Sequence, residues 1–318
     1  MVVALSGFVT GLATMWFIET LVALVFVVLD IRRTPENPVM KWGFVVITAF
    51  TGPLGAFLYV LGCREPLPGT HEAYVAARWR QALGSTLHCV AGDGIGILGA
   101  AAVTSAIRVS MPVEIAVEYG AGFLFGWTIF QALFMRDMAG GSYRRSLSST
   151  ALPEFLSMNG VMAGMVATMA LGRAWISAAA DPGQAAFWFV MSLATMAGVI
   201  VAYPINWWLV NAGMKHGMMT VRPAASPVPL IAGLYAAGVA LAKPARPEAH
   251  TGHEGHPAAP SAHTSQPLHG APRAHEEPSA HAAHGGHATG AGRDGLARMV
   301  VVSLVTLAVG IAVALSAA

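Results

Sequence analysis

The chain has 318 residues, of which 55% are hydrophobic and only 11% are charged, and its formal net charge is +2. Soluble domains carry roughly a quarter charged residues, so this composition excludes a soluble protein. The small net charge and the lack of a basic block argue against a nucleic-acid partner. Apolar runs of about 18 residues or more recur, each long enough to cross a lipid bilayer. We predict an all-α, polytopic transmembrane helix bundle with about seven or eight hydrophobic segments.

The hydrophobic segments are separated by polar loops. The first covers about 4–29 and lacks the basic start and the cleavage site of a signal peptide, so we expect it to be retained. The second, about 43–62, contains Gly52 and Pro53, which should kink or break it. We expect the remaining helices at about 82–107, 112–135, 150–172, 185–213 and 299–317, with a weaker segment at 229–242.

Changes in composition divide the chain into five parts. They are an N-terminal helical pair with an interfacial linker (1–81), a core four-helix membrane domain (82–222), a weak transmembrane segment (223–243), a His-rich loop (244–297) and a C-terminal transmembrane helix (298–318). The loop has no periodic apolar positions and is dense in Ala, Gly, Pro, Ser and His. Such a composition predicts disorder.

Basic residues predict which loops face the cytoplasm. The loop 136–146 carries three arginines, and Lys215 falls on the same side, as alternation requires. The loops at 31–42 and 64–80 are both basic, although one full crossing would separate them. A re-entrant second segment that turns back at Gly52 would put both inside, and a normally crossing segment is the alternative. The side on which the His-rich loop lies stays open.

The His-rich loop is a candidate metal-binding segment. The spacing H-x-x-H-x-x-H occurs twice, as 250-HTGHEGH-256 and 281-HAAHGGH-287. Imidazole is the commonest protein ligand for zinc, nickel and copper. The nine candidate ligands are His250, His253, His256, His263, His269, His275, His281, His284 and His287. The alternative is a low-complexity tract that drifted towards histidine, and metal binding alone would not make the metal a substrate.

A methionine stripe marks the predicted helix at 150–172. Met158, Met162, Met165 and Met169 follow a spacing that puts them on one helical face. Thioethers are soft ligands suited to Cu(I). Methionine is also an ordinary gap-filling residue in helix packing, and that alternative stays open.

The predicted helix at 82–107 carries a candidate intramembrane site. His88 and Cys89 are adjacent, and Asp93 lies one turn beyond Cys89 on nearly the same face. Such groups are costly in a membrane unless they are paired or face a cavity, so they are candidates for metal binding. The alternative is a hydrogen-bonded contact between helices.

Three carboxylates within predicted membrane helices are candidates for proton exchange or ion relay: Glu19, Glu118 and Glu154. Glu154 is also explained as a first-turn acid that favours the helix dipole. The sequence contains no GxSxG, P-loop or HExxH motif. We therefore expect no enzyme, no catalytic residues and no ATP-driven pump within this chain.

Three stretches carry a family resemblance: 52-GPLGAFLY-59, 86-TLHCVAGDGIG-96 and 203-YPINWWLVNAGMKHGM-218. With them, residues 5–220 resemble the bacterial integral membrane family called domain of unknown function 4396. The resemblance implies a multi-pass protein of the bacterial inner membrane and no settled activity. Family members read close to HCGAGC in the helix of Cys89, and Asp93 stands in place of their second cysteine. That difference favours a site of nitrogen, sulfur and oxygen ligands over a purely thiolate one.

Together these features predict a membrane protein for transition-metal binding, transport or homeostasis. The His-rich loop would capture ions, and the intramembrane site would be built from His88, Cys89, Asp93 and the methionine stripe. Copper is the favoured ion, whereas zinc or nickel would use the histidines and carboxylates and leave the methionines idle. The alternative is a non-transporting scaffold or assembly subunit whose polar residues join helices to other membrane subunits.

Overall fold

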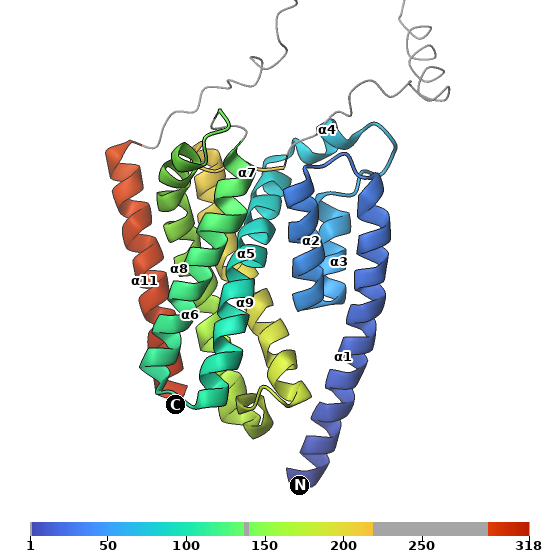
Figure 1. The fold of residues 1–318 in the computed structure, drawn as a ribbon, viewed down its shortest axis with the longest axis vertical. Helices are drawn as coiled ribbons and strands as arrows, with labels where there is room; N and C mark the ends of the chain where they lie inside the picture. The colour runs from blue at the N-terminus through green and yellow to red at the C-terminus, as the bar shows by residue number, and fades with distance from the viewer. Residues whose placement is uncertain (1, 137–139, 219–291, 318) are drawn as a thin grey trace, which may run out of the picture. The chain divides into compact units, whose positions relative to one another are not determined.

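The computed structural model describes residues 2–136, 140–218 and 292–317. All of its elements are helical (Figure 1), which confirms the predicted all-α class. Six stretches among the described residues are long and apolar enough to cross a membrane. The weak segment at 229–242 and the part of the His-rich loop that carries the nine histidines lie outside the described residues.

The N-terminal third contains one long helix and two short ones. Helix α1 (Val2–Asp30) is followed by η1 (Ile31–Arg33), α2 (Pro38–Thr51) and α3 (Pro53–Gly62). Asn37 caps α2 by accepting a hydrogen bond from the Val39 amide through its side chain at 2.9 Å. The chain breaks at Gly52, whose φ of +59° and ψ of −134° suit glycine alone. The predicted break at Gly52 and Pro53 is thereby confirmed.

Helices α2 and α3 fold back on each other as a hairpin. A Cβ on Gly55 would lie 2.6 Å from Thr48 Cα, so the first turn of α3 packs directly against the end of α2. Beyond the hairpin, Arg64 forms an ion pair with Asp30 at 2.8 Å, which joins the end of α3 to the end of α1. At a rise of about 1.5 Å per residue, neither short helix spans about 30 Å of hydrocarbon. This hairpin is the geometry that a re-entrant segment requires, and its position in a membrane remains a prediction.

The core follows in chain order: α4 (His71–Val75), α5 (Arg78–Ile107), α6 (Met111–Phe125), η2 (Gly126–Gln131), α7 (Ala132–Arg136), α8 (Tyr143–Trp175), η3 (Ser177–Ala180) and α9 (Ala185–Asn211). Helix α5 contacts both α6 and α9, and α8 packs along α9. The last pair approaches closely because Gly164 faces the backbone of Ala197, 2.5 Å from where its Cβ would stand.

The C-terminal helix α11 (Arg293–Ala317) packs along α8 (Figure 1). Asn159 of α8 donates a hydrogen bond to Ser303 Oγ at 3.1 Å, and Gly310 faces the backbone of Ala163. These two contacts show that α11 runs parallel to α8. Its first turns meet the end of α9 around Leu156 of α8. The described residues that flank 219–291 therefore lie at the same end of the bundle, which we call the cavity end.

Candidate functional site

Cys89 lies at the centre of a buried polar cluster built from α5, η2, α8 and the turn after α9. Its Sγ accepts from Gln131 Nε2 at 2.7 Å and from Lys215 Nζ at 2.7 Å, and it lies 3.5 Å from Glu154 Oε2. We refer to Cys89, Asp93, Gln131, Glu154 and Lys215 as the bundle cluster. Buried polar groups in a membrane helix bundle are expensive unless they satisfy one another, and in this cluster most of them do.

Lys215 supplies the positive charge of the bundle cluster. Its ammonium donates to Cys89 Sγ, to Glu154 Oε2 at 3.1 Å and to Asn206 Oδ1 at 3.1 Å, so each of its three protons has an acceptor. Burial lowers the pKa of Lys215, but Cys89 and Glu154 outweigh that effect and raise the pKa above its ordinary value. The lysine is therefore a cation at neutral pH, although only 6% of its surface is exposed.

Asp93 and Glu154 place two carboxylates beside that one ammonium. Both residues are fully buried, and the atoms Asp93 Oδ1, Asp93 Oδ2 and Glu154 Oε1 have no hydrogen-bond donor among the described residues. The two side chains interact directly with each other. Two adjacent carboxylates with one ammonium leave a place for a further positive charge, either a proton or a bound cation.

The π-helical segment η2 makes room for the carboxylates of Asp93 and Glu154. A Cβ on Gly126 would collide with Asp93 Oδ1 and Glu154 Oε1, so only glycine lets the two carboxylates share the space beside α6. Five residues further on, the same segment directs Gln131 towards Cys89. Short π-helical segments within α-helices are frequent at functional sites, and this one supplies both a gap and a ligand-orienting amide.

A cavity of about 440 Å³ lies at the cavity end and is lined by two members of the bundle cluster, Gln131 and Lys215. Its lining residues are Met40, Ser85, His88, Gln131, Ser148, Ser149, Thr150, Leu152, Pro153, Gly213, Met214, Lys215 and His216. The His88 ring packs against Phe130 with 5.3 Å between ring centres. Burial lowers the pKa of His216, so its imidazole is neutral at neutral pH, which is the metal-ligating form. The cavity thus brings two imidazoles together with Gln131 and Lys215, the two members of the bundle cluster that line it.

The structure partly assembles the predicted intramembrane site. His88, Cys89 and Asp93 come together with Glu154, whereas the four methionines of the stripe are buried in the core and none lines the cavity. Met158 lies close to the backbone of Asp93. A Cβ added to Gly122 would stand 2.7 Å from Met158 Cε and 3.2 Å from the Asp93 carbonyl oxygen. Met162, Met165 and Met169 continue along α8 away from the cluster.

The other two predicted relay carboxylates lie elsewhere. Glu118 is buried beside Glu114, which forms an ion pair with Arg173 at 2.7 Å and accepts a hydrogen bond from Ser105. Ser105 is 16 residues beyond Cys89 and 12 residues beyond Asp93 on α5, or about 24 and 18 Å along the helix axis. Glu19 is exposed on α1 and does not join either group.

Sequence reasoning missed three members of the polar core: Gln131, Asn206 and Lys215. Asn206 is fully buried and donates to Ser157 Oγ at 2.8 Å. Lys215 follows the end of α9 and reads as a cytoplasmic positive charge. The one signal for both residues was their position inside the motif that carries the family resemblance, YPINWWLVNAGMK.

A family model described as domain of unknown function DUF4396 matches residues 78–215. The match includes every member of the bundle cluster, from Cys89 to Lys215, and confirms the resemblance over that range. It does not extend over 5–77, where the resemblance was also expected. No curated protein and no solved structure matches the chain.

Proposed function

Since residues 78–215 belong to the DUF4396 family, we propose that this multi-pass membrane protein binds or transports a transition-metal ion, with copper favoured. The observation that carries the proposal is the buried pair of Asp93 and Glu154 beside Cys89, served by the single ammonium of Lys215. A buried set of two carboxylates, a thiol and a nearby imidazole is suited to a cation, and it is costly without one.

Lys215 would act as a resident counter-ion that an incoming metal replaces. Its ammonium occupies the side of Glu154 that also faces Cys89 Sγ, so a metal held by both residues would take over these contacts. Because Lys215 also lines the cavity, its side chain has space into which it can withdraw. With Cu(I), one unit of positive charge beside Glu154 would replace another.

The cavity end is the proposed entrance. His88 and His216 line the cavity, and the described residues that flank the His-rich segment lie at this same end. Beyond Asp93 the route is closed, since Ile97, Gly122 and Met158 pack tightly together. Glu118 lies eight residues from Gly126 along α6 and η2, or about 12 Å. A relay from Asp93 to Glu118 therefore requires this apolar layer to open.

Copper is favoured by the sulfur ligands. Cu(I) selects thiolate and thioether, which Cys89 offers in the cluster and Met158 offers beside it. Zinc or nickel would instead use the imidazole of His88 and the two carboxylates, without Met158. A Met158→Leu variant that loses copper but keeps zinc would assign the ion to the soft ligands.

Metal content of the purified full chain tests the proposal. We expect protein that lacks residues 250–287 to retain copper after reconstitution with Cu(I) and to lose it on Asp93→Asn with Cys89→Ser. The matched control is Asp181→Asn, an exposed acid in the loop before α9, which should keep the ion. Copper that disappears with the His-rich segment, while the cluster is intact, would contradict a bundle site.

The second candidate is a scaffold or assembly subunit, and Glu19 favours it. Its carboxylate is exposed within the candidate span Thr10–Arg33, where a charge facing hydrocarbon costs about 2.5–3.5 kcal/mol or more. A partner helix would cover it. If Glu19→Leu changes the size of the purified assembly, and cluster variants bind the same metal as the wild type, the scaffold function is supported instead.

A further inference from the structure

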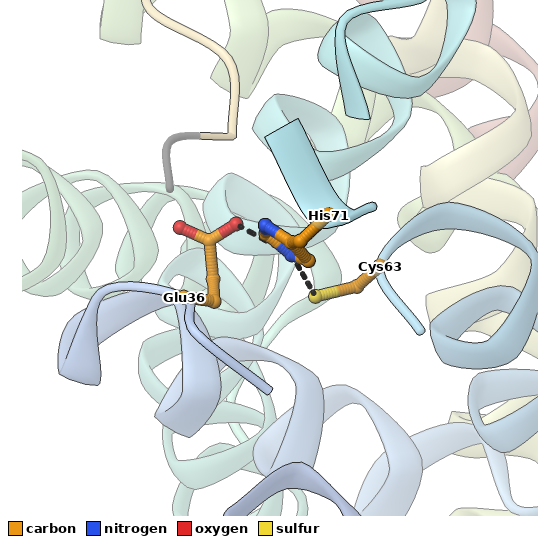
Figure 2. Close-up of side chains that lie close together, drawn as sticks. All are labelled: Glu36, Cys63 and His71. Carbon is orange, nitrogen blue, oxygen red and sulfur yellow. Dashed lines mark hydrogen bonds and ion pairs between the residues drawn. The ribbon is translucent and has the colours of Figure 1, made fainter. Parts of the chain in front are cut away.

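A second group of chemically reactive side chains lies at the open end of the α2–α3 hairpin. It consists of Glu36 before α2, Cys63 after α3 and His71 at the start of α4, which we call the hairpin triad (Figure 2). All three are buried, with relative exposures of 2%, 0% and 1%. None of them belongs to the bundle cluster or falls within the family match.

The three side chains point towards one another, with His71 between the other two (Figure 2). His71 Nε2 lies 3.9 Å from Cys63 Sγ and 3.9 Å from Glu36 Oε2, and one ligand atom from each residue lies within 4.8 Å of the others. Around a tetrahedral zinc ion, with bonds of about 2.0–2.3 Å, ligand atoms are roughly 3.5 Å apart. The two distances from His71 exceed that spacing by a few tenths of an ångström, and the Glu36 and Cys63 ligand atoms, within 4.8 Å of each other, would have to approach by up to about 1.3 Å.

The surroundings hold the triad in place. Glu36 Oε1 accepts from the Asn37 amide at 2.9 Å, which leaves Oε2 directed at His71. The His71 ring also interacts with the backbone of Cys63, and contacts of this kind help to orient a metal-binding imidazole. The hairpin itself brings Glu36 and Cys63 together across the two helices that separate them in sequence.

We propose that Glu36, Cys63 and His71 form a metal site for a divalent transition ion, with zinc as the ion that suits one sulfur, one nitrogen and one oxygen ligand. Three protein ligands leave a fourth position for water or another ligand, as in zinc sites that are not closed. A bound ion would clamp the loop before α2 to the end of α3 and the start of α4. The site does not depend on the function proposed for the bundle cluster.

Cobalt(II) is the probe, because cobalt bound to a thiolate shows a sulfur-to-metal charge-transfer band. The chain has only two cysteines, so each can be tested alone, and the His-rich segment contributes no thiolate. In full-length protein carrying Cys89→Ser, Cys63 is the remaining thiol. We expect this protein to show the band and to lose it when zinc is added, since zinc would occupy the same ligands.

Variants of the other two ligands complete the test. In the Cys89→Ser protein, His71→Gln should abolish the band. Glu36→Gln should weaken cobalt binding by at least about 10-fold, because losing even a residue that only hydrogen-bonds to a metal ligand lowers metal affinity by about that factor. Elution volume in detergent and helical content verify that each variant is folded. If one variant fails to fold, the other still decides the result.

A Cys89→Ser protein without the band would overturn the proposal and leave the triad as a thiol–imidazole hydrogen bond beside a carboxylate. The reciprocal protein, Cys63→Ser, reports on Cys89 and the bundle cluster alone. A band in that protein but none in Cys89→Ser would refute the hairpin site while supporting the bundle site. The reverse result would support the hairpin site and count against the bundle site.

Discussion

Single residues set the chemistry of the bundle cluster, and Gly126 does so by lacking a side chain. The carboxylates of Asp93 and Glu154 both reach the space that a Cβ at this position would fill. Their close approach concentrates negative charge at one point, which is what a proton or metal site in a membrane requires. Lys215 then balances part of that charge from the cavity side.

Gly126→Ala should lower the thermal stability of the detergent-purified protein, because a methyl group forced into this packed space costs about 1–3 kcal/mol. Gly120→Ala in the preceding helix α6 is the matched control, since no atom lies within 4 Å of its added Cβ. The control should be neutral or stabilising by up to about 1 kcal/mol. Equal melting temperatures for the two variants would show that the carboxylates do not occupy the space beside Gly126.

At the scale of elements, the α2–α3 hairpin decides which loops lie together. Gly52 reverses the chain between two proline-initiated helices, and the Asp30–Arg64 ion pair then joins the ends of α1 and α3. The two basic loops that one full crossing would separate therefore lie at the same end of the hairpin. The hairpin also creates the triad of Glu36, Cys63 and His71.

Gly52→Ala should open or strain the hairpin. The backbone at this position lies in a region that costs about 1–3 kcal/mol for other residues, and the new Cβ would stand 2.5 Å from Thr20 Oγ1. Gly69→Ala is the comparison, since it also has a positive φ but nothing within 4 Å. We expect thermal unfolding to show a larger loss of stability for Gly52→Ala. A loss no larger than that of Gly69→Ala would contradict a tight turn against α1.

At the scale of the whole molecule, α11 extends the bundle beyond the matched family region. It packs along α8 through Gly310 and Ala163, and its Ser303 accepts a hydrogen bond from Asn159. Asn159 in turn accepts from Tyr119 at 2.7 Å, so a polar chain links α11, α8 and α6. The C-terminal helix is therefore an integral part of the described bundle.

Gly310→Leu should separate α11 from α8, because a Cβ at this position would already stand 2.5 Å from Ala163 Cα. The separation would also break the Asn159–Ser303 hydrogen bond, and an unsatisfied buried amide costs about 1–3 kcal/mol. Thermal unfolding in detergent measures the loss. Val309→Leu, at a neighbouring position that is 59% exposed, should leave stability unchanged. Equal stability of the two variants would argue that α11 contributes nothing to the bundle.

The amino-acid sequence by itself determined the helical membrane class, most helix positions and the break at Gly52, because apolar run length, glycine and proline act locally. It also singled out His88, Cys89, Asp93 and Glu154 as candidates, since polar groups in apolar helices are conspicuous. Only the tertiary structure placed Lys215 and Gln131 against Cys89 and excluded Glu19 from the cluster. Those contacts join residues up to 126 positions apart, and they depend on helix rotation and packing that no local pattern records.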